Sequence, residues 1–181
     1  MKTFKCIIVA AMMAIALPSF AQFTTGGKSG RASSFSENVI PTGYKGFVDL
    51  GYGIGTGDFG ADRIMLTTSH GYQVNTYFFA GIGAGVNYYT DGDLVSIPIF
   101  ADFRGTFPIS NSKIAPFLDM KIGYTVNDVE GFYFAPGIGI RIATSEKAGF
   151  NIGIGYELQK FDAYYSKETC GAFAIKVGYD F

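Results

Sequence analysis

The sequence predicts an all-β protein, an eight-stranded antiparallel up-and-down transmembrane β-barrel. Apolar residues recur at every second position in eight separate segments of the chain. Charged residues make up only 16% of the chain and aromatic residues 17%, whereas about 25% of an ordinary soluble domain is charged. After the first 21 positions there is no run of about 18 apolar residues, the length that a membrane helix needs.

The first 21 residues have the pattern of a secretory signal peptide. Lys2 and Lys5 precede a twelve-residue apolar run, CIIVAAMMAIAL, and the small residues Ser19 and Ala21 mark a cleavage site. Twelve residues are too few to span a bilayer, so we expect export with cleavage near Ala21. Residues 22–43 are polar and rich in Gly and Ser, which predicts a flexible lead-in before a barrel over 44–181.

Alternation of apolar and polar residues defines eight expected strands after this lead-in. Their ranges are 46–54, 63–72, 77–89, 94–106, 117–124, 132–143, 150–159 and 169–181. Most approach the 9–11 residues of a tilted membrane strand. The links are short, the last of them over 160–168, which predicts antiparallel neighbours. Because a closed barrel has no edge strand, we expect a bulge or a missing ladder bond at Pro98 and Pro136.

The two faces of the expected strands differ in composition. One face is apolar, as in Val48, Leu50 and Tyr52, and its aromatic residues lie toward strand ends, as in interfacial girdles. The other face is mostly Gly and Ala with a few charges of both signs, which suits a narrow lumen filled by side chains. We therefore expect the apolar face to contact lipid. A soluble lipocalin-like ligand-binding barrel, with an apolar interior, is an alternative.

Charged residues on the mixed face are expected to form ion pairs inside the lumen, most of them in the periplasmic half. They are Asp49, Arg63, Asp102, Arg104, Asp119, Lys121, Arg141, Glu157 and Lys176. We expect Lys176 near Asp49 and Arg141 near Asp119, because a buried charge without a partner costs about 3–5 kcal/mol. A gated ion path is the alternative, which the narrow interior of an eight-stranded barrel disfavours.

Few residues indicate catalysis or ligand binding, and no enzyme, cofactor or metal is predicted. The one histidine, His70, is expected on the lipid face near the periplasmic rim, away from any Ser-His-Asp arrangement. Cys170 is the one cysteine after the signal peptide, so no internal disulfide is expected. Without Lys2 and Lys5 the chain has 12 basic and 15 acidic residues, about −3 in net charge, and nothing suggests nucleic acid. Acidic loop residues are interpreted as solvated, with divalent-cation binding as the alternative.

The last strand and the glycine-aromatic texture resemble a known family. A signal peptide, eight alternating strands and a terminal aromatic resemble the small OmpA/OmpX-type outer-membrane barrels. The segments TTSHGYQVNTYFFAGIGAGVNYY and FYFAPGIGIRI resemble more closely the outer-membrane β-barrel family common in Bacteroidota. The resemblance implies that the last strand is an assembly signal read by the barrel-assembly machinery. The matching residues are Phe173, Ile175, Val177, Tyr179 and Phe181.

These patterns together predict an integral protein of the cell outer membrane with a structural or surface-interaction role. Outer-membrane lipid and lipopolysaccharide are its expected partners, besides the assembly machinery during biogenesis. A narrow, porin-like passive channel is the first alternative. If both termini are periplasmic, the links after the first, third, fifth and seventh strands are the surface loops.

Overall fold

The computed structural model describes residues 40–57, 60–90, 92, 94–110, 112–163 and 166–181. The chain divides into two units, Met1–Ser36 and Glu37–Phe181, and all described residues belong to the second. The predicted signal peptide and most of the predicted lead-in therefore lie outside the described residues.

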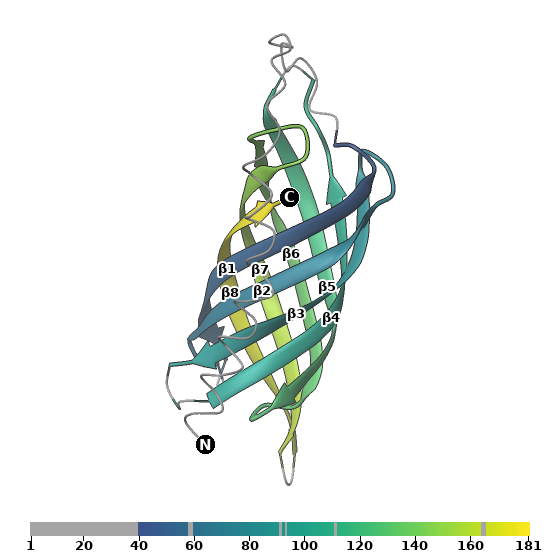
Figure 1. The fold of residues 1–181 in the computed structure, drawn as a ribbon. Coiled ribbons are helices and arrows are strands. Elements are labelled where there is room, and N and C mark those ends of the chain that lie inside the picture. Colours follow the sequence, from purple (N-terminus) through teal and green to yellow (C-terminus); the bar gives the residue numbers. More distant parts are fainter. Residues whose placement is uncertain (1–39, 58–59, 91, 93, 111, 164–165) are drawn as a thin grey trace, which may run out of the picture. The chain divides into compact units, whose positions relative to one another are not determined.

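Eight antiparallel strands close into a barrel in the described part of the chain, as Figure 1 shows. Each strand pairs with the next along the sequence, and the first pairs with the last. The strands are β1 (Gly43–Thr56), β2 (Arg63–Gln73), β3 (Phe78–Tyr89), β4 (Leu94–Thr106), β5 (Ile114–Asn127), β6 (Gly131–Ala143), β7 (Gly149–Ala163) and β8 (Ser166–Asp180). The predicted fold, an all-β, eight-stranded antiparallel up-and-down barrel, is confirmed.

The seam between β1 and β8 closes the barrel and leaves no edge strand among the described residues. Leu50 faces Val177 across this seam, and Phe47 faces Asp180. Beyond them, the backbone N–H groups of Gly46 and Phe181 each donate to the carbonyl of the other residue, at 2.9 and 3.0 Å. Closure satisfies the ladder groups that an open sheet would expose.

Side chains alternate between the wall's outer face and the lumen, as the sequence predicted. In β5, buried and exposed residues follow one another from Ile114 to Ile122. The lumen contains charged and polar residues together with Phe47, Phe100 and Tyr133, while Leu, Ile and aromatic side chains are exposed outside. No helix in the described residues is long and apolar enough to cross a membrane.

Two of the three prolines inside strands, Pro98 and Pro136, interrupt one ladder each without shifting its register. Between β3 and β4 the pairing stops after Ala84 with Ile99 and resumes at Asn87 with Ser96, so it skips Pro98 in an unchanged register. Between β6 and β7 it skips Pro136 in the same way. The missing ladder bond was predicted correctly, and no bulge is needed because the opposite neighbour of each proline, β5, pairs without a break.

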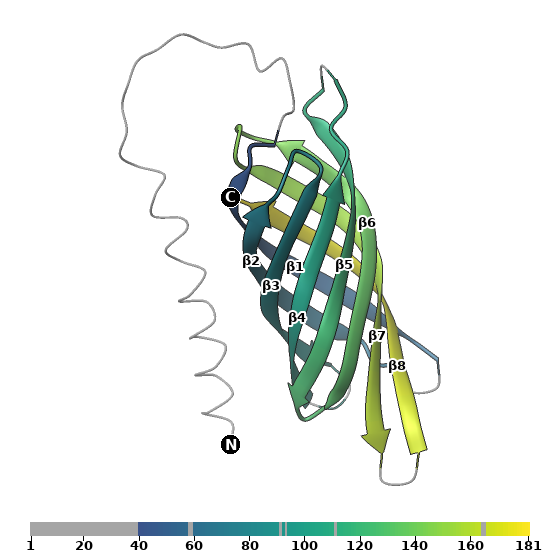
Figure 2. The same cartoon turned by 90° about the vertical axis from the view of Figure 1, so that its right-hand side faces the viewer.

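The barrel has two ends, which we call the terminus end and the loop end. The terminus end holds the start of β1, the end of β8 and the links β2–β3, β4–β5 and β6–β7; the loop end holds the other four links. At the loop end β7 and β8 extend beyond their neighbours (Figure 2), because their ladder continues to Ala163 with Ser166. The predicted loop over 160–168 is thus mostly strand, since its two halves pair with each other.

Glycines on the lumen face make room for larger side chains from other strands. A Cβ at Gly178 would meet Oδ1 of Asp49, and a Cβ at Gly139 would lie 2.6 Å from the ring of Phe117. Such contacts are closer than real Cβ atoms allow. Aromatic and acidic side chains therefore pack into the space that the glycines of the lumen face leave free.

Candidate functional site: the charged lumen

All nine charged residues predicted for the lumen occupy inward positions of their strands. Eight are buried, and the side chain of Lys176 is 14% exposed. They extend from Arg63 at the loop-end start of β2 to Arg141 near the terminus end of β6. Most of them nevertheless lie in the terminus-end half of their strands, among them Arg104, Asp119 and Arg141; that this half is periplasmic stays a prediction.

The central cluster joins β1, β4 and β5 across the lumen. Nζ of Lys121 lies 3.0 Å from Oδ2 of Asp49, and Nη2 of Arg104 lies 3.6 Å from the same oxygen. Asp119 is a weaker partner, at 3.9 Å from Lys121 and 4.0 Å from Arg104. Two cations thus share two carboxylates, and the cluster ties β1 to β4 and β5, which are not its neighbours in the sheet.

Arg104 is also held between aromatic rings. Its guanidinium carbon lies 4.0 Å from the ring centre of Phe47 and 4.6 Å from that of Phe117. Such cation–π contacts stabilise a cation most where water is excluded. Asp102, on the same face of β4, is fully buried, and neither of its carboxylate oxygens has a hydrogen-bond partner among the described residues.

A second cluster, nearer the loop end, is built around Glu157 of β7. Nζ of Lys176 lies 3.0 Å from Oε1 of Glu157, and the hydroxyl of Tyr133 donates to the same oxygen at 3.0 Å. Nε of Arg63 lies 3.7 Å from Oε2. Glu157 is therefore reached from β2, β6 and β8, so one carboxylate connects three strands.

Tyr89 spans the lumen at the loop end of this cluster. Its hydroxyl accepts a hydrogen bond from Nη1 of Arg63 at 3.1 Å and donates to Oε1 of Gln159 at 2.6 Å. The hydroxyl of Ser96 is 3.4 Å away. This network links β2, β3, β4 and β7.

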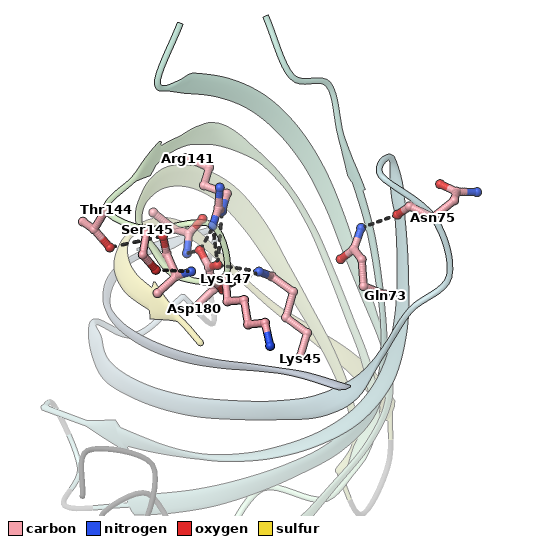
Figure 3. Close-up of polar contacts among 10 residues, drawn as sticks. Lys45, Gln73, Asn75, Arg141, Thr144, Ser145, Lys147 and Asp180 are labelled. Carbon is pink, nitrogen blue, oxygen red and sulfur yellow. Dashed lines mark hydrogen bonds and ion pairs between the residues drawn. The ribbon is translucent and has the colours of Figure 1, made fainter. Parts of the chain in front are cut away.

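The third cluster lies at the terminus end and centres on Asp180 (Figure 3). Nε of Arg141 donates to both carboxylate oxygens, at 2.9 and 3.1 Å, and Nη2 donates to Oδ2 at 2.9 Å. Asn151 donates to Oδ1 at 3.0 Å, and Nζ of Lys45 lies 2.6 Å from Oδ2. Lys45 also donates to the carbonyl of Lys147. Asp180 is thus bound from β1, β6 and β7 in a fully buried position.

Of the two contacts predicted from the sequence, the first holds in part and the second is corrected. Lys176 lines the same small cavity as Asp49, but its ion pair is with Glu157, and Lys121 contacts the carboxylate of Asp49 from across the lumen. Arg141 pairs with Asp180 and not with Asp119. Asp119 lies opposite Gly137, four residues from Arg141 along β6, which is roughly 13 Å of strand.

Sequence reasoning missed Asp180 and Lys45, the residues that complete the terminus-end cluster. Alternation alone would have found Asp180, which has the same parity as Lys176 on β8. Lys45 lies before the strand that was expected to start at 46, whereas β1 begins at Gly43. Tyr89 and Gln159 were missed because they are uncharged, although they too occupy inward positions.

The lumen contains a small cavity of about 10 Å³ beside the central cluster. Its lining includes Asp49, Arg104, Asn151 and Lys176, and this volume is close to what one water molecule needs. Among the described residues no group of three His, Cys, Asp or Glu side chains is placed to hold a metal ion. The cavity therefore has room for about one water molecule, and the side chains that line it carry charges of both signs.

The predicted assembly-signal residues lie along the closing strand. Phe173, Ile175 and Val177 are exposed on the outer face, and Tyr179 packs against Phe150 with ring centres 5.2 Å apart. Phe181 packs over Gly46, where a Cβ would meet its ring at 2.5 Å. These positions leave recognition by an assembly machinery as a prediction.

His70 lies on the outer face near the terminus end, as predicted. The hydroxyl of Tyr44 is 2.6 Å from Nδ1, and the hydroxyl of Thr68 is 3.0 Å from Nε2. The ring also contacts Phe181 edge-on. Both ring nitrogens therefore lie within hydrogen-bonding distance of a hydroxyl group.

Asp62 stabilises the link from β1 to β2 through two hydrogen bonds. Its carboxylate accepts hydrogen bonds from the backbone N–H of Gly55 at 3.0 Å and from the hydroxyl of Tyr52 at 2.9 Å. The hydrogen bond from the Gly55 amide, and to a smaller extent the one from the Tyr52 hydroxyl, lowers the pKa of Asp62 below its usual value of 3.8. Hydrogen bonds to the ionised form have this effect.

This lowered pKa predicts a pH-dependent contribution of Asp62 to stability. The contribution is present above the unfolded pKa, near 3.8, and is lost as pH falls through the lower folded pKa. Unfolding of the wild type and of Asp62→Asn in detergent, compared between pH 7 and pH 2.5, measures it. We expect the difference between the two proteins to shrink at the lower pH. A difference that grows on acidification would contradict the assignment.

The closed eight-stranded antiparallel barrel is the fold class of small outer-membrane proteins. No protein-family model matches this chain, and no curated protein matches it. Neisserial surface protein A shares the fold with a TM-score of 0.62 at 12% identity, over 76% of this chain and 95% of that protein. The outer membrane protein OprG from Pseudomonas aeruginosa shares it with a TM-score of 0.51 at 13% identity, over 80% of this chain and 98% of that protein. At this level of identity the likeness concerns the fold.

Proposed function

We propose that this protein is an integral outer-membrane β-barrel with a structural or surface-interaction role, whose lumen is closed by its own side chains. The observation that carries the proposal is a distribution of polar and apolar side chains opposite to that of a soluble protein. Lys, Arg, Asp and Glu side chains are buried inside the barrel, while Leu50, Ile82 and Ile154 are more than half exposed outside. A soluble protein rarely exposes so continuous an apolar surface, whereas hydrocarbon favours it.

The soluble lipocalin-like alternative requires the opposite arrangement. A ligand-binding barrel of that kind has an apolar interior and a polar outer surface. Here the interior contains three charged clusters, centred on Asp49, Glu157 and Asp180. The charges inside therefore favour the membrane barrel over the soluble one.

The ion-pair clusters also support a closed lumen over a passive channel. Each cluster crosses the interior between non-neighbouring strands, and Tyr89 with Gln159 spans it near the loop end. A narrow channel is the second candidate, favoured by buried polar atoms that have no hydrogen-bond partner in the described residues, such as those of Asn87 and Asp102. Water beside such atoms would be the start of a conducting path.

Fractionation and planar-bilayer recording test the proposal together. We expect the protein to stay with membranes during a carbonate wash, to migrate on gels in a heat-modifiable way, and to conduct no more than brief, small currents. An Asp49→Ala, Arg104→Ala double variant, which opens the central cluster, is the comparison for conductance. Release by carbonate would contradict membrane insertion, and large, steady wild-type conductance would contradict the closed lumen.

A further inference from the structure

Arg63 is a buried cation whose charge is not balanced within its own cluster. Its side chain is fully buried at the loop-end start of β2, and Nε lies 3.7 Å from Oε2 of Glu157, which has no hydrogen-bond partner. Oε1 of Glu157 lies 3.0 Å from Nζ of Lys176. The described residues around Glu157 thus place two cations beside one carboxylate. A buried charge needs a partner, so this cluster lacks one anion.

Several N–H groups of Arg63 also lack an acceptor. Nη1 donates to the hydroxyl of Tyr89 at 3.1 Å and to Sγ of Cys170 at 3.9 Å. Neither Nε nor Nη2 has a hydrogen-bond partner among the described residues. A guanidinium presents its N–H groups in a planar fork, which suits an anion with two oxygen atoms. The unbalanced charge and the free donors therefore match the same kind of group.

A glycine of β1 lets Arg63 approach the lumen face of β8. β1 lies between β2 and β8, and Gly53 is the register partner of both Arg63 and Ala174. A Cβ at Gly53 would lie 3.1 Å from Cγ of Arg63 and 3.4 Å from Cβ of Ala172. Arg63 therefore crosses β1 over Gly53, and Cys170 is the next inward residue of β8 toward the loop end.

Cys170 lies near the loop-end mouth of the lumen. The pairing of β1 with β8 ends at Thr56 with Gly171, so Cys170 lies one residue beyond the end of β1. It is 4% exposed and forms no disulfide. This small exposure excludes a bulky thiol reagent more than it excludes a molecule little larger than water. Because no second cysteine follows the predicted signal peptide, oxidation of Cys170 cannot end in an internal disulfide.

We propose that Cys170 is a site of oxidation by hydroperoxides and that Arg63 binds the sulfinate that results. The sulfur attacks one oxygen of hydrogen peroxide, so that an S–O bond forms, the O–O bond breaks, and the thiol proton leaves with the second oxygen as water. A second peroxide oxidises the sulfenic acid to a sulfinic acid with release of another water. Loss of the sulfinic acid proton then gives an anion with two oxygen atoms.

The sulfinate supplies the anion that the cluster around Glu157 lacks. The distance of 3.9 Å from Nη1 of Arg63 to Sγ of Cys170 exceeds the length of an N–H···O hydrogen bond, about 2.7–3.2 Å. An oxygen bonded to Sγ therefore comes within hydrogen-bonding reach of the guanidinium. The sulfinate and Glu157 together balance the two cations. The inference goes beyond the proposed function and depends on the closed barrel, not on its location in a membrane.

Peptide mass spectrometry measures the oxidation after the folded barrel, in detergent, has been treated with hydrogen peroxide and then unfolded and digested. Trypsin releases residues 168–176, which contain Cys170 and no methionine, so oxygen added to this peptide belongs to the cysteine. We expect two added oxygen atoms in the wild type. In Arg63→Leu, which leaves one cation for one carboxylate, we expect this product to form about tenfold more slowly, because hydrogen bonds to a charged group are lost.

Thr125→Cys in a Cys170→Ser background is the matched control. Thr125 is fully buried toward the same end of the barrel, and its hydroxyl has no hydrogen-bond partner in the part of the chain that is described. Its cysteine is expected to oxidise about tenfold more slowly than Cys170, a comparison that remains decisive if Arg63→Leu fails the heat-modifiability test of closure. Equal oxidation of Cys170 with and without Arg63, equal oxidation of the two cysteines, or a Cys170 that reacts only after unfolding would overturn the inference.

Discussion

Asp180→Ala is expected to lower the free energy of unfolding by about 3–5 kcal/mol, because it leaves Arg141 and Lys45 buried without their carboxylate. Arg141 makes three contacts of 2.9–3.1 Å to Asp180, and Lys45 lies 2.6 Å from it. Equilibrium unfolding in urea, with the barrel in lipid vesicles, measures this loss. Heat-modifiable gel migration reports whether the variant still closes.

Asp62→Asn is the control for Asp180→Ala, because it also removes an acidic charge, but that of a half-buried residue in a link at the other end of the barrel. Its effect near neutral pH, where the contribution of ionised Asp62 is fully present, is expected to be well below that of Asp180→Ala. In the double variant Asp180→Ala, Arg141→Leu the unpaired guanidinium is removed as well, so the combined loss is expected to be less than the sum of the single losses. Strict additivity would mean that the two residues do not interact as described.

Val177→Arg is expected to cost about 2–4 kcal/mol in lipid, since arginine on the lipid face near the bilayer midplane has this penalty. Val177 is 51% exposed, and its register partners Leu50 and Ile152 are also exposed on the outer face. Folding into vesicles of known thickness, followed by urea titration, measures the cost. Val177→Leu, which keeps the apolar surface, is expected to be near neutral.

The neighbouring substitution Gly178→Arg tests the opposite face of the same strand. A Cβ at Gly178 would meet the carboxylate of Asp49, so the new side chain displaces Asp49 from Lys121. We expect destabilisation of Gly178→Arg both in detergent and in lipid, whereas Val177→Arg is penalised mainly in lipid. If both variants are tolerated equally well in every medium, the assignment of the inward and outward faces of β8 is wrong.

Much of the barrel could be predicted because alternation is a local property of the sequence. Period-2 patterns placed the strands and separated inward Asp49 from outward Leu50, and short links determined the antiparallel order. The ends of β7 and β8 were misjudged because residues 160–168 contain polar residues that are typical of loops. They form strand instead because the two segments pair with each other.

The lumen contacts could be predicted only in part. Sequence patterns identify which residues point inward, but partners across the lumen depend on strand tilt and stagger, which no local pattern encodes. Asp49 was therefore assigned to Lys176 on the adjoining strand, whereas Lys121 reaches it from the far wall. The central importance of Asp180 was missed because its partners come from three separate strands.

The seam between β1 and β8 also constrains how the protein folds. It joins Phe47 to Asp180, residues at opposite ends of the barrel sequence, so the last ladder forms only after almost the whole barrel segment is available. Contacts between residues so far apart in sequence slow folding, because the chain loses loop entropy before it gains them. Until that moment β1 and the growing sheet each present an unpaired edge that can recruit another chain. The interval between synthesis and closure is thus the time of greatest aggregation risk for this protein.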